Sequence, residues 1–257
     1  MTISNSIFVY NGQGSNPICV EQTTQNLKKK YGKNYSVIEV DGSYLAREAR
    51  PALYVLPGGK ASHMGQGLEQ AAQKINNCVE KGSGVLAFCA GAMVASSHWE
   101  YTIPTKDTPY FVGINNPQPR YLLNLGPFAF DPTFFDSKHQ FEDYLEDTVA
   151  HMADISLLLE KESCKCFWNQ GPVFDAGRDD VVLAQYVFPT NPRIKNIKPS
   201  AVIHSTYGYG DIVFLGIHPE LAQWSQNNGY SLSNHDLKWN DFLFEESCRL
   251  AGLRRPN

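Results

Sequence analysis

Short apolar runs that alternate with helix-like segments constrain the fold of this chain more than any other feature of its sequence. The apolar runs occupy residues 6–10, 35–40, 52–57 and 84–88. Helix-like segments, each closed by a glycine, occupy residues 19–32 and 67–82. This alternation is typical of a parallel sheet with crossover helices. The first half of the chain therefore predicts an α/β fold.

Glycine concentrates in the loops that follow these predicted strands. The loops read NGQGSNP (11–17), PGGKASHMG (57–65) and CAGA (89–92). In open α/β sheets, ligands bind in the loops at the carboxyl ends of the strands. We therefore expect the functional site at this edge of the sheet.

The second half of the chain has a different pattern. Residues 103–140 are rich in proline, asparagine and aromatic residues, which predicts turns and short strands, and residues 141–161 have helical spacing. Residues 100–165 are thus predicted to be a variable insertion or flap within a single domain of residues 1–257. Strands are predicted again at 164–168, 181–187, 200–208 and 211–218. The last two flank YGYG and predict a hairpin, so the sheet gains antiparallel strands.

Composition and charge exclude several classes of partner. A formal net charge of -4 without an extended basic run argues against nucleic acid or an anionic membrane as partner. The amino terminus lacks the apolar core of a signal peptide, which predicts a cytoplasmic protein, although unconventional export would leave no trace in the sequence.

Six cysteines are too few in a chain of this length to predict a disulfide scaffold. Their spacings include no paired C-x-x-C motif, so they do not predict a zinc site. Cys164 and Cys166 would lie on one face of a strand, where we expect a packed pair. We expect no metal and no cofactor.

Cys89 lies where the predicted strand 84–88 meets a run of small residues. Ala87 and Gly91 provide the small side chains that a nucleophile elbow needs two positions before and after its reactive residue. On such a turn the thiol would face a helix N-terminus, which lowers a thiol pKa. The alternative is a buried core cysteine, which is a common place for free cysteine.

His218 and Glu220 follow the last predicted strand. A histidine at one strand end can take the proton of a cysteine at a neighbouring strand end, and a carboxylate two residues on can hold the other ring nitrogen. The simpler interpretation of His-Pro-Glu is a turn. Gly58 and Gly59 let backbone N–H groups approach a ligand and would suit half of an oxyanion hole, although consecutive glycines commonly serve only a tight turn.

Three patterns follow one another along the chain, each at the end of a predicted strand: Pro-Gly-Gly, x-Cys-x-Gly and His-Pro-Glu. Their order resembles that of the class I glutamine amidotransferase-like superfamily. The sequence is most similar to the amidotransferase-like domain at the N-terminus of eukaryotic biotin-protein ligases, which also occurs as stand-alone bacterial proteins. The segments that carry this resemblance are VYNGQGS (9–15), YVLPGGKA (54–61), VLAFCAGAMVAS (85–96), FWNQGPVF (167–174) and GIHPEL (216–221). The resemblance implies a flavodoxin-like three-layer sandwich with a mostly parallel central sheet, added antiparallel strands and a Cys-His-Glu triad.

The resemblance also implies a role for each matched residue. Cys89 would be the nucleophile, His218 the base and Glu220 the group that orients it. The oxyanion would be bound by the N–H of Ala90 and by one from Gly58 or Gly59. Further residues match positions near the same pocket and are weaker candidates for substrate contact: Asn11, Gly12, Asn169 and Gln170. Lys60 and His63 could also line the pocket.

The leading hypothesis is a cysteine hydrolase or amidotransferase-like enzyme that acts on a small-molecule or peptide amide through a thioester. Transfer of ammonia would need a separate partner protein, because no synthetase domain is attached. No nucleotide-binding glycine loop occurs, so we do not expect formation of biotinyl-adenylate. The alternative is a non-catalytic module that binds a small molecule or a protein in the same pocket. A redox role for Cys89 is a third possibility, against which the His-Pro-Glu argues.

Overall fold

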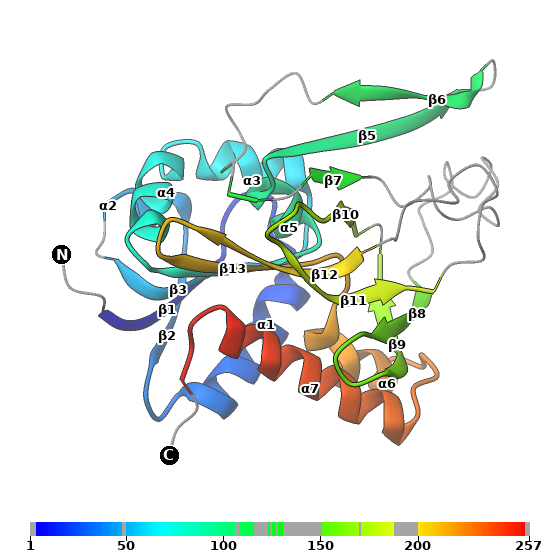
Figure 1. The fold of residues 1–257 in the computed structure, drawn as a ribbon. Coiled ribbons are helices and arrows are strands. Elements are labelled where there is room, and N and C mark those ends of the chain that lie inside the picture. The colour runs from blue at the N-terminus through cyan, green and yellow to red at the C-terminus, as the bar shows by residue number, and fades with distance from the viewer. Residues whose placement is uncertain are drawn as a thin grey trace.

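Five parallel strands form the half of the sheet that carries the predicted site (Figure 1). They lie in the order β2 (Ser36–Val40), β1 (Ser4–Tyr10), β3 (Pro51–Leu56), β4 (Gly84–Phe88) and β13 (Gly210–Leu215). Every neighbouring pair in this series is parallel. The first four positions follow the order of flavodoxin-like sheets.

The computed structural model describes residues 4–47, 50–105, 108–115, 123, 125–126, 128–130, 151–169, 171–187 and 200–254. None of the helices in these ranges is long and apolar enough to cross a membrane.

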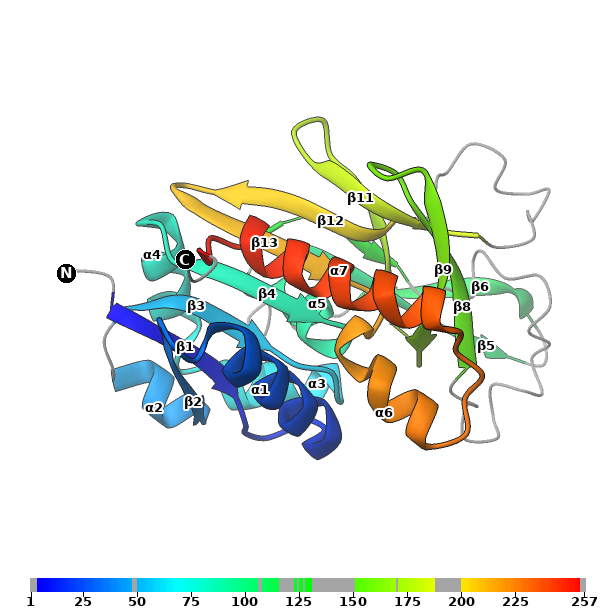
Figure 2. The same cartoon turned by 90° about the horizontal axis from the view of Figure 1, so that it is seen from below.

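Helices cover both faces of the parallel strands (Figure 2). One face carries α1 (Pro17–Tyr31), α6 (Ala222–Asn227) and α7 (Asn234–Leu250). The other carries α2 (Gly42–Arg47), α3 (Ala61–Leu68), α4 (Ala72–Glu80) and α5 (Ala90–Ala95). Successive side chains of a strand point to opposite faces, so Ile7 and Val9 join the core under α1 and α7, whereas Phe8 and Tyr10 join the other core.

The remaining strands extend the sheet beyond β13, mostly by antiparallel pairing. They are β5 (His98–Thr105), β6 (Thr108–Asn115), β7 (Phe128–Phe130), β8 (His151–Leu157), β9 (Glu162–Trp168), β10 (Val173–Asp175), β11 (Val181–Tyr186) and β12 (Ser200–Tyr207). The hairpin predicted around YGYG joins β12 to β13, and Gly208 in its turn has a φ of +61°. The predicted fold class, a three-layer α/β sandwich with added antiparallel strands, is confirmed.

The helix predicted over residues 141–161 is wrong for its second part, because residues 151–157 form strand β8. Ala153, Ile155 and Leu157 are buried in alternation with more exposed neighbours, which is the period of a strand. Pairing with β9 on one side and β11 on the other supplies the backbone hydrogen bonds of this strand. Residues 141–150 of the predicted helix lie outside the described residues.

Candidate active site

Cys89 occupies a sharp turn between β4 and α5, with backbone angles φ +47° and ψ −110°. A positive φ is strained for any residue with a side chain. The turn is held because the Cys89 N–H donates to the Leu215 carbonyl at 2.7 Å and the Cys89 carbonyl accepts from the Met93 N–H at 3.0 Å. Gly91 is needed here, since a Cβ on it would lie 2.3 Å from the Leu56 carbonyl oxygen of β3.

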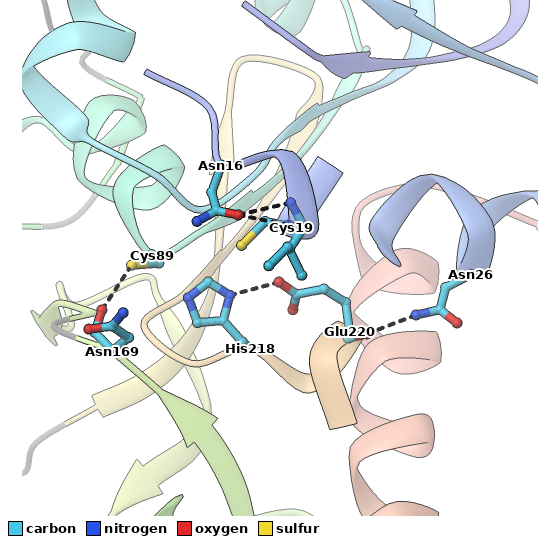
Figure 3. A network of polar contacts seen from close by, with 8 residues as sticks. Asn16, Cys19, Asn26, Cys89, Asn169, His218 and Glu220 are labelled. Carbon is cyan, nitrogen blue, oxygen red and sulfur yellow. Dashed lines mark hydrogen bonds and ion pairs between the residues drawn. The ribbon is translucent and has the colours of Figure 1, made fainter. Parts of the chain in front are cut away.

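His218 follows β13, two residues before Glu220 in the short 3-10 helix η5 (Pro219–Leu221). Its Nδ1 and the Glu220 Oε1 are 2.7 Å apart, and both side chains are buried. The His218 N–H donates to the Phe167 carbonyl, and Asn26 of α1 donates to the Glu220 carbonyl (Figure 3). Burial alone would lower the pKa of His218, but the Glu220 carboxylate and the two thiols of Cys19 and Cys89 together outweigh it and hold that pKa well above its ordinary value.

Two thiols lie beside this imidazole, those of Cys89 and Cys19 (Figure 3). Both thiols contribute to the raised pKa of the imidazole, and the Cys89 Sγ donates to the Asn169 carbonyl oxygen at 3.6 Å. Cys19 lies in the first turn of α1, whose N-cap Asn16 accepts from the Cys19 N–H at 3.3 Å. Burial raises the pKa of Cys19, and the neighbouring His218 opposes that rise.

Cys19 is a site residue that the sequence reasoning missed. Its one sequence signal is its position after the NGQGSNP loop, which leaves the carboxyl end of β1 at the same sheet edge as the other loops. The Sγ of Cys19, a ring nitrogen of His218 and a carboxylate oxygen of Glu220 all lie within 4.8 Å of one another. Among the described residues, these three side chains are therefore a possible set of metal ligands.

The absence of a side chain at Gly58 lets the His218 imidazole pack against the loop after β3. A Cβ on Gly58 would lie 2.5 Å from the His218 Cε1 and 3.0 Å from the Cys19 Sγ. Real side chains do not approach so closely, so glycine is required for the ring and the sulfur to occupy these places. Gly59 is equally confined, since its Cβ would lie 2.0 Å from the Gly14 carbonyl oxygen.

A cavity of about 670 Å³ opens on these groups. Of the residues named from the sequence, Cys89, His218, Gly59, Asn169, Lys60 and His63 line it. Phe167, Trp224 and Tyr230 contribute aromatic rings that contact one another edge to face or at a tilt. Ala90 and Gly58 adjoin lining residues in the chain, and Glu220 lies behind the imidazole.

Two of the residues predicted near the same pocket lie away from it. Asn11 lines a separate cavity of about 370 Å³, where its Nδ2 donates to the Glu39 Oε2 at 2.9 Å. Gly12 packs against the Tyr10 ring, 2.7 Å from where its Cβ would be. Both residues lie at the start of the loop between β1 and α1, whereas Gly14, Ser15 and Asn16 at the end of the same loop line the cavity. Gln170 lies outside the described residues.

Cys164 and Cys166 are both buried in the core under α1 and α7. Burial, followed by the nearby carboxylates of Asp236 and Asp154, raises the pKa of Cys164 to about 12. This environment agrees with the packed pair expected from their spacing.

The order of the parallel strands and the convergence of Cys89, His218 and Glu220 at their carboxyl ends define an amidotransferase-like α/β sandwich. Solved structures share this fold over almost the whole chain. One is a glutamine amidotransferase with a TM-score of 0.60, 17% sequence identity and coverage of 96% of this chain and 99% of that chain. Another is a cytoplasmic protein of Salmonella typhimurium with a TM-score of 0.51, 12% identity and the same coverage of each chain.

The family follows from a match that runs through most of the sequence. The chain belongs to the family described as the N-terminal part of biotin-protein ligase, whose model matches residues 5–254. The biotin-protein ligase of Schizosaccharomyces pombe is 28% identical over 261 residues, an alignment that covers 98% of this chain. The chain spans 38% of the length of that relative.

Proposed function

We propose that this protein is a cysteine-dependent amide hydrolase or amidotransferase-like enzyme with Cys89, His218 and Glu220 as its catalytic triad. The observation that carries the proposal is one imidazole with the Cys89 thiol and the Glu220 carboxylate on its two sides, at the wall of a cavity. A nucleophile, a base and a group that orients the base are the parts that acyl transfer requires. The strained turn at Cys89 supports the proposal, because such strain is concentrated at functional sites.

In the proposed reaction, the Cys89 thiol gives its proton to His218 and the sulfur attacks the amide carbonyl carbon. The resulting oxyanion accepts hydrogen bonds from the N–H of Ala90 and from that of Gly58 or Gly59. His218 then protonates the departing amine, the C–N bond breaks and a thioester on Cys89 remains. Water or an acceptor amine attacks the thioester after giving a proton to His218, and the Cys89 thiol is restored.

The proposed substrate is a small-molecule amide or the amide of a short peptide. A cavity of about 670 Å³ is within the range of small-molecule sites. The cavity also has both apolar and polar walls, since Phe167, Trp224 and Tyr230 contribute rings whereas Lys60 and Asn16 contribute polar groups. Transfer to a second substrate would involve a separate partner protein that delivers or receives the amine.

The test is acylation of the protein by 4-nitrophenyl acetate, followed by nitrophenol release and by mass spectrometry of peptides. We expect a burst, an acetyl group on Cys89 and then steady turnover. Replacement of Cys89 by Ser should remove the burst, and His218→Ala should slow both phases. Cys78→Ser is the matched control, because Cys78 is also buried but belongs to the core under α4.

A second measurement does not depend on the choice of substrate. Iodoacetamide should alkylate Cys89 faster in the wild-type protein than in His218→Ala at pH 7, because His218 takes the proton of the thiol in the proposed triad. Equal rates in the two proteins, together with no turnover of the ester, would favour a module that binds its ligand without reaction.

A further inference from the structure

Three aromatic rings form one wall of the cavity beside the proposed general acid, and we call Phe167, Trp224 and Tyr230 the aromatic wall. The buried ring of Phe167 lies in the middle, with its centroid 5.9 Å from that of the His218 imidazole. The Trp224 and Tyr230 centroids lie 5.8 Å and 5.2 Å from it, and all three contacts are edge to face. Trp224 and Tyr230 are only partly buried, so they present apolar surface to the cavity.

The aromatic wall lies on the leaving-group side of the proposed reaction. His218 protonates the departing amine, so a substituent on that amine lies on the side of the imidazole. Phe167 contacts this imidazole directly, and its carbonyl accepts from the His218 N–H at 2.9 Å. The substituent on the amide nitrogen therefore faces the aromatic wall, where burial and ring contacts stabilise an apolar or aromatic group.

The loop that would hold the oxyanion carries a positive charge. Gly58 and Gly59 lead directly into Lys60, whose N–H donates to the Gly14 carbonyl at 2.7 Å. The Asn16 N–H donates to the Gly58 carbonyl at 2.9 Å, so this loop is fixed to the one before α1. The Lys60 side chain lines the cavity, and its ammonium group has no hydrogen bond or ion pair within the described part of the chain. A group on the acyl part of the substrate can therefore reach this ammonium.

None of the described residues that line the cavity is Asp or Glu, although the chain has 26 acidic residues. The Glu220 carboxylate is buried behind the imidazole, where its Oε1 lies 2.7 Å from the His218 Nδ1. A chain with a net charge of -4 thus presents the positive charge of Lys60 in a cavity whose described lining has no carboxylate. Such a cavity favours an anionic substrate over a neutral one of the same shape.

We propose that the substrate is an amide with an anionic acyl part and an apolar or aromatic amine part. A carboxylate of the acyl part pairs with Lys60, and the substituent of the amine packs on the aromatic wall. This inference rests on the proposed function, because it assigns the two sides of that reaction. Hydrolysis breaks the C–N bond, consumes one water and releases a dicarboxylic acid and a free amine, and the Cys89 thiol is restored. Ammonia, the leaving group of a primary amide, has no substituent to reach the wall.

The test uses matched amides as substrates of the full chain. They are the 4-nitroanilides of succinic and glutaric acid, the methyl esters of these two compounds, and succinamic acid. Absorbance follows release of 4-nitroaniline, and a coupled assay follows release of ammonia from succinamic acid. The kcat/KM of the better free acid should exceed that of its methyl ester about tenfold or more, because only the acid forms a charged hydrogen bond with Lys60.

Two variants assign the two parts of the substrate, and each compares a substrate with itself, so intrinsic reactivity cancels. Lys60→Ala should lower kcat/KM about tenfold for the free acids and hardly change it for the methyl esters, whereas Lys60→Arg should retain the preference for the acid. Trp224→Ala should lower kcat/KM about tenfold for the anilides and hardly change it for succinamic acid. Lys29→Ala and Trp239→Ala are matched controls, because neither residue lines the cavity.

The substrate class and the proposed function fail in different ways. Equal effects of Lys60→Ala on acids and esters, or of Trp224→Ala on anilides and succinamic acid, would overturn the substrate class, while acetylation of Cys89 by 4-nitrophenyl acetate would leave the proposed function intact. Binding is measured separately in Cys89→Ser, where the nitroanilide quenches tryptophan fluorescence. Tighter binding of the acid, with the preference lost on adding Lys60→Ala, would support the class even if the wild type turned nothing over, and that result would contradict the proposed function alone. Equal binding of acid and ester, or no binding of either, would overturn the class.

Discussion

At the scale of single residues, the backbone and side-chain packing at the site leave room for few substitutions. Cys89 adopts a positive φ despite its side chain, and Gly58 leaves only enough room for the His218 ring and the Cys19 sulfur. Both constraints act within the loops at the carboxyl ends of the strands. They can be tested without knowledge of the substrate.

The strain at Cys89 predicts an unusual order of stability among its variants. Cys89→Gly should be more stable than Cys89→Ala by about 1–3 kcal/mol, because only glycine adopts this backbone conformation without strain. Both variants lack the thiol, so the comparison isolates the backbone. Urea denaturation at equal protein concentration measures the difference. If the alanine variant were the more stable, the turn would not be strained as described.

Gly58→Ala should disturb the site more than the fold. Its Cβ would lie 2.5 Å from the His218 Cε1, so the ring must shift from its present position, and we expect slower alkylation of Cys89 with a loss of about 1–3 kcal/mol in stability. The control is Gly177→Ala, where the nearest atom to the new Cβ is the end of the Asp180 side chain at 3.0 Å. An alkylation rate equal to that of the control would contradict the steric role of Gly58.

At the scale of elements, α7 is fixed to the sheet by its first turn. Ser233 and Asp236 form a capping box, and the Asp236 Oδ1 also accepts from the Lys165 N–H of β9 at 2.7 Å. Asn240, one turn later, donates to the Lys165 carbonyl. These bonds join a helix start to a strand edge, which orients α7 over β9.

Asp236→Ala should destabilise the protein by about 1–2 kcal/mol through loss of the cap. Burial alone would raise the pKa of Asp236, but hydrogen bonds from the Lys165 N–H and from the hydroxyl and N–H of Ser233, with the nearby His235, outweigh it and lower that pKa. A lowered pKa in the folded state means that this stabilisation is present above the unfolded pKa of about 4 and is lost as pH falls through the folded value. Denaturation at several pH values should show the wild type converging on Asp236→Ala in acid, with Asp179→Ala, at an exposed site, as the control.

The elements that could be predicted from the sequence are those whose own pattern decides their structure. The parallel strands are short apolar runs between glycines, and their shared edge brings Cys89, His218 and Glu220 together. The helix expected at 151–157 failed because spacing alone did not reveal the two antiparallel neighbours of β8. Cys19 escaped notice because the direction of α1 after its Asn16 cap, and not a motif, carries that thiol to the imidazole.

At the scale of the whole molecule, segments from the amino-terminal and carboxyl-terminal parts of the chain contact one another at the site. Helix α1, from the amino-terminal part, contacts η5 and lies on the same face as α7. Asn26 of α1 donates to the Glu220 carbonyl at 3.0 Å, and Lys30 forms ion pairs with Asp241 and Glu245 of α7. Contacts between distant segments therefore position the carboxylate behind His218.

Asn26→Ala should reduce the alkylation rate of Cys89 severalfold, because η5 loses a bond that holds Glu220 and thereby the imidazole. Gln25→Ala is the matched control, since Gln25 is the preceding residue of α1 and its side chain bonds only within the helix, to Glu21, among the contacts of the described residues. Circular dichroism should show equal helix content in both variants. Equal alkylation rates in the two variants would show that Asn26 does not act on the site.

The pairing of β13 with β4 also decides when the Cys89 thiol meets the His218 imidazole. Leu215 pairs with Phe88, so residues 89 and 218 leave their strands at the same level. A ribosome completes Cys89 long before it reaches His218, and until β13 inserts between β4 and β12 the nascent thiol lacks the His218 imidazole. A nascent chain therefore brings Cys89 and His218 together only after β13 has joined the sheet.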